Sequence, residues 1–229
     1  MKTIGLVGGT GWISTVEYYR IINQEVNNRL GKSHSARCIL YSLNYEELVE
    51  FNQQNSREGV FQLINSAAKR ISAAGADCIV LCANTLHQFV NRLEAELELP
   101  IIHIADATAR EITRVNISKV GLLGTRQTME MDFYKMKLKQ HSIETLIPDI
   151  SEREYIQNTI SNELVKNIFV DESRLKFRDI INNLERAGAE GIILGCTEIP
   201  LLVNHNDGDI PYFNTLQIHA KAAVDFALG

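Results

Sequence analysis

The chain has 229 residues, 45 % of them hydrophobic, and a formal net charge of −5 at pH 7 with both signs interspersed, so nucleic-acid binding has little support. No apolar stretch approaches the roughly 18 residues that a membrane helix needs, and the N-terminus shows no signal-peptide pattern. The four cysteines lack the paired spacing of zinc ligands, so we expect a cytoplasmic globular protein with no metal, no membrane partner and no nucleic-acid partner.

Short apolar runs bounded by turn residues predict buried strands. In chain order these strands cover residues 4–7, 36–41, 78–81, 101–104, 120–123, 144–147 and 191–194. Between them, apolar residues from Val60 to Ile71 recur on one face of a helix, and those from Phe177 to Leu184 repeat the pattern before Gly188, a candidate C-cap. Strands that alternate with helices predict parallel sheets flanked by helices, which is an α/β fold.

The two halves of the chain resemble each other. Residues 75–85 (GADCIVLCANT) and 188–198 (GAEGIILGCTE) both predict a helix end, a short buried strand and a polar loop. Residues 2–8 (KTIGLVG) and 118–124 (SKVGLLG) give a second match, which aligns Tyr18 with Tyr134. We therefore predict two pseudo-symmetric α/β domains with the active site in the cleft between them. The N-terminal domain is expected at residues 1–100 plus 210–229, and the C-terminal domain at residues 101–209.

Ligands of parallel sheets bind beyond the carboxyl ends of the strands. Three segments have that position, namely residues 8–15, 82–87 and 195–198, with residues 124–128 as the repeat partner of the first. The glycines after the first strand do not follow the Gly-x-Gly-x-x-Gly spacing, and no acidic residue ends the second strand. A dinucleotide reductase is therefore only a third candidate, and we interpret the glycines as allowing close backbone approach to a small ligand.

Cys196 is the strongest candidate for chemistry. It lies where a strand gives way to a turn, a position at which unpaired backbone N–H groups and a helix dipole lower the pKa of a thiol. A buried structural cysteine is the alternative. The polar neighbours Thr197 and Glu198 favour a catalytic thiol.

The loop after residue 83 supplies groups that suit a carboxylate ligand. Asn84 and Thr85, together with Thr197, offer amide and hydroxyl groups beside loop N–H groups. The alternative is that these residues only cap the helices that follow. His87 and Glu198 are weaker candidates for an acid or a base.

A series of motifs across nearly the whole chain resembles the aspartate/glutamate racemase superfamily. They are the turn 8–12 (GGTGW), the loop 82–87 (CANTLH), the run 103–108 (HIADAT), the stretch 122–130 (LLGTRQTME) and residues 195–199 (GCTEI). The chain is most similar to the broad-specificity amino-acid racemase branch, which includes an enzyme that isomerises L-glutamate and L-aspartate. The resemblance implies two pseudo-symmetric α/β domains, a homodimer, and catalysis without pyridoxal phosphate or any other cofactor.

The resemblance also implies a two-base reaction, in which one cysteine removes the α-proton and the opposite cysteine returns a proton to the other face. The second of these cysteines matches Cys196, but the first matches Ala83, which can neither accept nor donate a proton. In the isomerising branch this position can be threonine, so activity does not require a cysteine there. Cys82 should face the sheet packing, because adjacent strand side chains point to opposite faces, unless the strand breaks at Leu81.

Contacts with the substrate are implied in the same way. Asn84, Thr85 and Thr197 would hold the α-carboxylate. The residues expected around the side-chain end of the amino acid are Thr10, Trp12, Asn52, Thr125 and Thr128. Lys166 matches a lysine that binds the distal carboxylate in some aspartate racemases, the alternative being a solvated lysine at a helix end.

The leading interpretation is a cofactor-independent racemase of aspartate, glutamate or a related amino acid, with Cys196 as the acid/base thiol. A water, His87 or a hydroxyl would then replace the thiol missing at Ala83. The alternatives are a one-base isomerase or decarboxylase-like enzyme, and a non-catalytic homologue that binds amino acids. Ala83 as a substitution introduced to trap a ligand is a further possibility. The sequence determines neither the amino acid used nor the oligomeric state.

Overall fold

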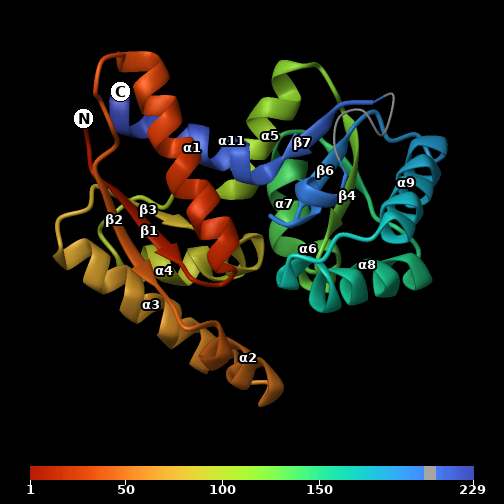
Figure 1. Ribbon diagram of the computed structural model, residues 1–229, viewed down its shortest axis with the longest axis horizontal. Coiled ribbons are helices and arrows are strands. Elements are labelled where there is room, and N and C mark those ends of the chain that lie inside the picture. The colour runs from red at the N-terminus through yellow and green to blue at the C-terminus, as the bar shows by residue number, and fades with distance from the viewer. Residues whose placement is uncertain (204–209) are drawn as a thin grey trace. The chain divides into compact units, whose positions relative to one another are not determined.

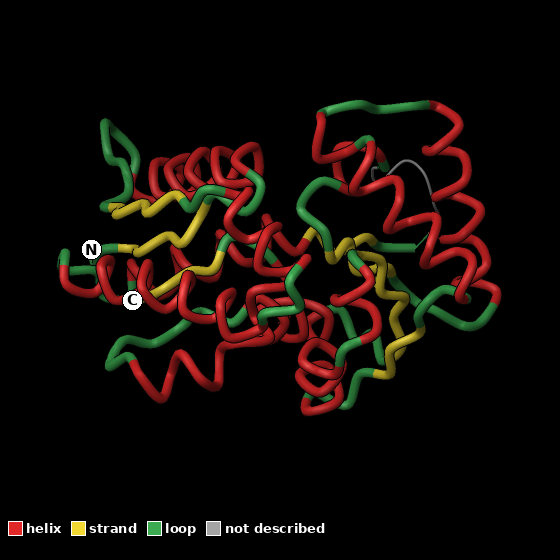
Figure 2. Tube along the Cα trace, turned by 90° about the horizontal axis from the view of Figure 1, so that it is seen from below, coloured by secondary structure: helices red, strands yellow, loops and turns green. Residues whose placement is uncertain are grey.

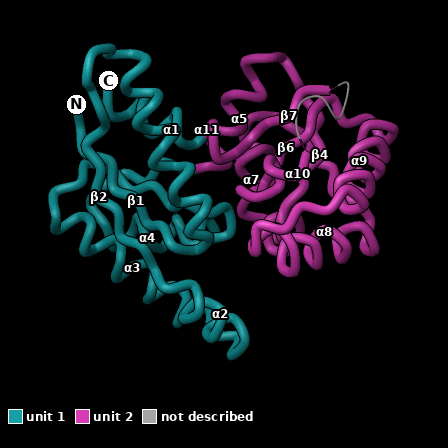
Figure 3. The backbone as a smooth tube through the Cα atoms, viewed as in Figure 1, with its two compact units in different colours: residues 1–103, 219–229 teal, residues 104–218 magenta. Residues whose placement is uncertain are grey.

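The computed structural model describes residues 1–203 and 210–229, and the chain divides into two compact units (Figure 3). Unit 1 comprises Met1–His103 and His219–Gly229, and unit 2 comprises Ile104–Ile218. The domain boundaries expected from the sequence stay a prediction, and the expected end of the C-terminal domain at residue 209 lies outside the described residues.

Unit 1 is built on a three-stranded parallel sheet in the order β2-β1-β3 (Figures 1 and 2). The strands are β1 (Ile4–Gly8), β2 (Cys38–Ser42) and β3 (Cys78–Leu81). The helices of this unit are α1 (Trp12–Leu30), α2 (Tyr45–Gln53), α3 (Arg57–Ala73), the 3₁₀-helix η1 (Asn84–Phe89), α4 (Val90–Glu96) and the last part of α11 (Thr215–Leu228). Ile79 and Leu81 of β3 pack with Phe61 and Ile64 of α3, so one face of the sheet is covered by α3.

Unit 2 is built on a four-stranded parallel sheet in the order β5-β4-β6-β7. The strands are β4 (Lys119–Gly124), β5 (Glu144–Leu146), β6 (Ile192–Gly195) and β7 (Tyr212–Asn214). The helices are α5 (Ile104–Arg114), α6 (Arg126–Glu130), α7 (Asp132–Gln140), α8 (Ile150–Asn162), the 3₁₀-helix η2 (Leu164–Lys166), α9 (Asp171–Arg186) and α10 (Ile199–Leu202). Leu122 packs with residues of α5 and α7, whereas Leu123 packs with residues of α8 and α9, so helices cover both faces.

The two sheets share one topology, which confirms the predicted α/β fold with two parallel sheets. In each sheet the first strand is central and is flanked by the second and the third. The likeness extends to a further parallel pairing beside the third strand of each sheet. In unit 1, Ile101 forms an isolated parallel bridge with Ile79 of β3, and at the equivalent place in unit 2, β7 pairs with β6. The expected helix end at Gly188 is also present, since α9 ends at Arg186 and Gly188 has a φ of 96°.

The sequence-based prediction is wrong at one strand and shifted at another. The strand predicted for residues 101–104 is only the bridge at Ile101, because Ile104 already begins α5. β2 begins at Cys38 instead of residue 36. β7 pairs with β6, so residues 212–214 lie in the second sheet, although the sequence suggested their return to the first domain.

Each half of the chain ends in a helix that packs with the other half: α5 ends the first half and packs in unit 2, and α11 ends the second half and packs in unit 1 from His219 onward. α5 follows Ile101, which pairs with the unit 1 sheet, yet α5 packs on the unit 2 sheet through Ala109 and Ile112. α11 follows β7 of unit 2, yet from His219 onward it belongs to unit 1. There the amide of Lys2 donates to the carbonyl of Ala227 at 2.9 Å. No helix in the described part of the chain is long and apolar enough to cross a membrane.

Gly9, directly after β1, combines a positive φ of 87° with close approach to another strand end. A Cβ at Gly9 would lie 2.1 Å from the carbonyl oxygen of Leu43. Gly75 has a similar φ of 91°, but a Cβ there would meet nothing within 4 Å. A substitution at Gly75 therefore adds only the strain of positive φ, whereas a substitution at Gly9 adds steric overlap as well.

We expect Gly9→Ala to lower the free energy of unfolding more than Gly75→Ala does, by about 1–3 kcal/mol, because only Gly9→Ala adds overpacking to the strain of positive φ. Urea unfolding of both variants measures this difference. Equal losses in the two variants would show that the approach of Leu43 to Gly9 is not tightly constrained.

Candidate active site

In unit 1, the turn after β1 is held by its own hydrogen bonds. The amide of Gly9 donates to Oγ1 of Thr15 at 2.9 Å, and the hydroxyl of Thr15 donates to the carbonyl of Gly11 at 3.1 Å. Oγ1 of Thr10 is buried and has no hydrogen-bond partner among the described residues. Trp12, the first residue of α1, is 69 % exposed. The turn is therefore held by internal hydrogen bonds that do not use the Thr10 hydroxyl.

Ala83 follows β3 and precedes η1. Its backbone is extended, with φ −150° and ψ 140°, and the amide of Cys82 continues the ladder by donating to the carbonyl of Val7 at 2.9 Å. Ala83 packs against the same core cluster as Leu81, whereas Cys82 is buried outside that cluster. Burial also raises the pKa of Cys82. β3 ends at Leu81, but the ladder bond of Cys82 and the extended backbone of Ala83 carry the alternation of side chains past it, so Cys82 is not turned to the side that Ala83 faces.

His87, in η1, is buried, and its Nε2 lies 3.3 Å from the carbonyl oxygen of Leu81. Because a carbonyl only accepts, Nε2 carries the hydrogen and donates. Burial holds the pKa of His87 well below its ordinary value, and the neighbouring His103 and His219 act in the same direction. His87 is therefore neutral at pH 7 and committed to the backbone, which makes it a poor proton donor to a substrate.

In unit 2, the carboxyl ends of β4 and β6 approach each other closely. Gly124 pairs with Gly195, and a Cβ at Gly195 would lie 3.2 Å from Cγ2 of Thr128. Thr125 is the N-cap of α6 and accepts from the amide of Thr128 at 3.3 Å, and their hydroxyl oxygens are 3.0 Å apart. This brings the predicted residues Thr125 and Thr128 to the strand ends beside Cys196.

Cys196 forms a buried pair with Glu198. Its Sγ donates to Oε2 of Glu198 at 3.1 Å, and the hydroxyl of Thr197 donates to the same oxygen at 2.8 Å. Cys196 is 6 % exposed and Glu198 is 7 % exposed. Burial, and then the charge of Glu198, raise the pKa of Cys196 well above its ordinary value.

The expectation of a lowered pKa at Cys196 is therefore wrong for this structure. Backbone N–H groups of Glu198 and Ile199 do lower the pKa, as the strand-end position suggested, but their effect is smaller than that of burial. At rest the thiol is protonated, with a carboxylate oxygen within hydrogen-bond reach. The sequence contained this pairing, since Glu198 stands two residues after Cys196, but the direction of the pKa shift depends on burial.

The remaining predicted contact residues differ in exposure. Asn52 lies on an exposed part of α2, and Lys166 is exposed in η2. Asn84 is buried at the start of η1, while Thr85 and Thr197 are partly buried. Their roles toward a substrate stay predictions. Within residues 1–203 and 210–229, no group of three or more His, Cys, Asp or Glu side chains is arranged to hold a metal ion.

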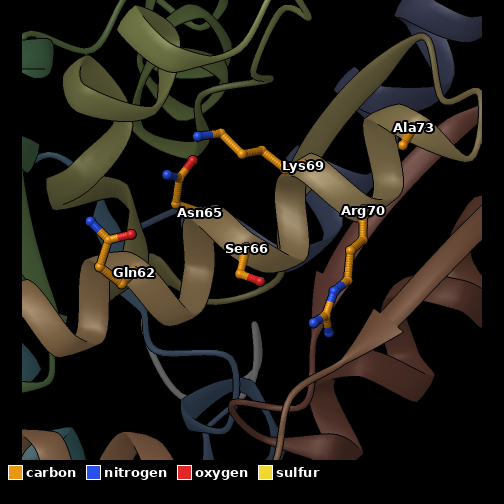
Figure 4. Close-up of a pocket in the computed structure, with 6 residues that line it drawn as sticks. All are labelled: Gln62, Asn65, Ser66, Lys69, Arg70 and Ala73. Carbon is orange, nitrogen blue, oxygen red and sulfur yellow. The ribbon is translucent and has the colours of Figure 1, made fainter.

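A surface hollow on α3 contains none of the predicted site residues (Figure 4). It is lined by Gln62, Asn65, Ser66, Lys69, Arg70 and Ala73. The Lys69 ammonium is paired with Glu96 at 2.6 Å, and Arg70 donates to the hydroxyl of Tyr41. Both cations thus already have partners, and all the residues that line the hollow belong to α3 and none to a strand end.

Comparison with known proteins shows the family to which the chain belongs. The model of the Asp/Glu/hydantoin racemase family matches residues 7–223, so the chain belongs to this family. The chain is 25 % identical over 165 residues to the broad-specificity amino-acid racemase RacX of Bacillus subtilis, which covers 70 % of this chain and 69 % of RacX. Racemases are isomerases, and membership in this family confirms that the chain is of isomerase type.

Two solved structures share the fold over the full length of both chains. One is a candidate Asp/Glu racemase from Yersinia pestis, with a TM-score of 0.94 and 46 % identity. The other is an aspartate racemase homologue from Pyrococcus horikoshii OT3, with a TM-score of 0.87 and 33 % identity. The resemblance inferred from the motifs is thereby confirmed.

We expect Glu198→Gln to speed the reaction of Cys196 with iodoacetamide at pH 8 by at least about threefold. Removing the carboxylate charge lowers the pKa of the thiol, and the gain in thiolate outweighs the accompanying loss of nucleophilicity. Peptide mass spectrometry measures the rate at each cysteine. Cys38, whose pKa burial raises to about 11, is the internal reference, and Glu190→Gln is the matched control for charge loss in unit 2. An unchanged or slower rate at Cys196 would contradict the assigned effect of Glu198.

Proposed function

We propose that this protein is a cofactor-independent racemase of aspartate, glutamate or a related amino acid that works by thiol-based α-proton transfer. The observation that carries the proposal is the buried Cys196–Glu198 pair, with 3.1 Å between Sγ and Oε2, at the carboxyl end of β6. A thiol beside a carboxylate at a strand end is suited to moving one proton to and from a bound ligand.

In the proposed reaction, Glu198 takes the proton of Cys196 and the thiolate then removes the α-proton of the amino acid. The buried surroundings that raise the thiol pKa make the thiolate a strong base, because proton affinity rises with pKa. The same thiol can return the proton when the reaction runs in reverse. Thr197 keeps the carboxylate in place by donating to the oxygen that faces Sγ.

The opposite face of the substrate has no thiol in this proposal. Ala83 occupies that position, Cys82 is buried, and His87 is neutral and bonded to the backbone. A water held by a hydroxyl such as that of Thr10 is then the proposed second proton source, since Oγ1 of Thr10 has no partner among the described residues. The same observations favour a second candidate, a one-base isomerase or decarboxylase-like enzyme.

The proposed substrate is anionic at one or both ends. Asn84, Thr85 and Thr197 offer amide and hydroxyl groups to the α-carboxylate, and Lys166 is a candidate for the distal carboxylate. The names of the relatives support this class, because they include a broad-specificity amino-acid racemase and an aspartate racemase homologue. We keep aspartate and glutamate as the first substrates to test.

A homodimer in the cytoplasm is also part of the proposal. Val16 and Tyr19 of α1 are more than half exposed, and Leu40 on the edge strand β2 is 47 % exposed. Exposed apolar side chains next to an unpaired strand edge suit contact with another protein surface. Light scattering would then give about twice the chain mass of 25.8 kDa.

We expect the protein to exchange the α-proton of aspartate or glutamate in D₂O, and Cys196→Ala to lower this exchange at least about 100-fold, the usual contribution of an acid/base group. Proton NMR measures the exchange, and Cys38→Ala, which removes a thiol from β2, is the matched control. Full exchange in Cys196→Ala would refute the role of this thiol. Stabilisation by the amino acid without any exchange would favour the binding homologue.

We expect Ala83→Cys to raise the fraction of exchange events that invert the configuration, because a thiol at this position adds a proton donor to unit 1. Chiral chromatography of the product, set against the NMR exchange rate, gives this fraction. Ala83→Val is the control, since it adds similar volume without a proton. If the unmodified protein already inverts both enantiomers at every exchange, a second donor exists and the one-base candidate is wrong.

A further inference from the structure

His219 lies where α11 enters unit 1, and it is fully buried. Its Nε2 is 2.7 Å from the carbonyl oxygen of Ile102, and its Nδ1 is 2.8 Å from the hydroxyl of Tyr18. A carbonyl only accepts, so Nε2 carries the hydrogen and Nδ1 accepts from Tyr18. His219 thus joins α11 both to α1 and to the segment that leaves unit 1 at His103.

Two further histidine rings lie beside this one. The ring centroid of His87 is 5.2 Å from that of His219 and 4.8 Å from that of His103. The titratable groups that face His219 are therefore Tyr18 from α1, His87 from η1 and His103 from the segment before α5. His87 in turn donates to the carbonyl of Leu81. We call His87, His103 and His219 the histidine cluster.

Unit 2 has a threonine at the position that corresponds to His219. Thr108 and His219 are each the fifth residue of a helix, α5 and α11, and these helices follow equivalent positions of the two sheets. The hydroxyl of Tyr134 donates to Oγ1 of Thr108 at 3.2 Å, and Thr108 donates to the carbonyl of Ile104 at 2.8 Å. In unit 2 a threonine hydroxyl thus accepts a hydrogen bond from a tyrosine and donates one to a carbonyl. The fold therefore does not require a histidine at this position.

We propose that the histidine cluster is an acid-sensitive latch, in which protonation of His219 releases the unit 1 part of α11 and loosens η1. The inference goes beyond the proposed reaction and does not depend on it. η1 is affected because it contains His87 and begins at Asn84, the residue expected to bind the carboxylate.

Protonation acts on the contacts of His219 described above. A second ring hydrogen at Nδ1 of His219 ends its role as acceptor, so the Tyr18 hydroxyl must turn away its own hydrogen and accept instead. The new charge lies in a fully buried position beside two other imidazole rings, where an ion is costly. Release of α11 lets water reach the charge.

The pH range of the latch follows from the same burial. Burial lowers the pKa of His219 to about 4, whereas the ring of an unfolded chain titrates near 6.5. The released state therefore binds protons more readily than the closed one, so the closed state is fully stable above about pH 6.5 and loses stability as pH falls toward 4. His87, whose pKa burial also lowers, adds a change of the same sign.

Hydrogen–deuterium exchange between pH 7.5 and 4.5, corrected for the intrinsic rate, tests the latch on the full chain. We expect protection of the α11 peptides from His219 onward to fall relative to α5 by a factor on the order of 10² over this range. In His219→Thr, which copies Thr108, this relative loss should shrink to the share that His87 contributes. His219→Gln, whose amide can both donate and accept, serves the same purpose if the threonine variant does not fold.

Two results would overturn the latch. One is a parallel loss of protection in α11 and α5 of the unmodified protein, and the other is the same loss in α11 of both His219 variants. Neither readout needs a substrate, so failure of the proposed racemase activity would leave this test unaffected.

Discussion

Parallel pairing around one central strand is the constraint on which the rest of this molecule depends. In unit 1, β1 is paired with both neighbours, and in unit 2, β4 is. Because the strands run in one direction, their carboxyl ends share one edge of each sheet, and the polar turns that follow them are brought together there. Thr10 and Asn84 meet this condition in unit 1, as do Thr125 and Cys196 in unit 2. Residues far apart in the chain thereby become neighbours at a strand edge.

Burial then decides what these neighbours can do. The strand-end amides near Cys196 favour a thiolate, but the surrounding core and the carboxylate of Glu198 disfavour it more strongly. The resting thiol therefore keeps its proton, which lowers its chance of oxidation or alkylation in the absence of a ligand. The thiolate of Cys196 is weakly populated, but it is a strong base. Such a base suits removal of the proton from an α-carbon, because that proton is far less acidic than the proton of a thiol.

The sequence predicted the features that depend on residues close together in the chain. The runs 78–81 and 191–194 are apolar and flanked by glycine or polar residues, and both are strands within a residue of the expected ends. The run at 101–104 looks alike but ends in a helix, because a short apolar run cannot distinguish a buried strand from the start of a buried helix. Site residues at strand ends were predictable for the same reason as the strands themselves.

Other features depend on contacts between distant parts of the chain. The partner of Tyr18 is His219, and the partner of His219 is the carbonyl of Ile102, pairs that no spacing rule connects. The raised pKa of Cys196 likewise depends on how deeply it is buried, which neighbours from several helices determine. Sequence patterns give the direction in which a strand or helix points its side chains, but not the depth at which they finally lie.

The exchange of last helices between the units has a consequence for the origin of the chain. A half that once folded alone would have covered its own sheet with its own last helix. In this chain α5, the last helix of the first half, covers the sheet of unit 2, and α11, the last helix of the second half, completes unit 1. A half-length ancestor that formed a dimer by swapping this helix, followed by tandem duplication and fusion of its gene, produces this connectivity directly. On that view the two halves have never been independent folding units, and separating them near residue 103 would leave the first without its final helix.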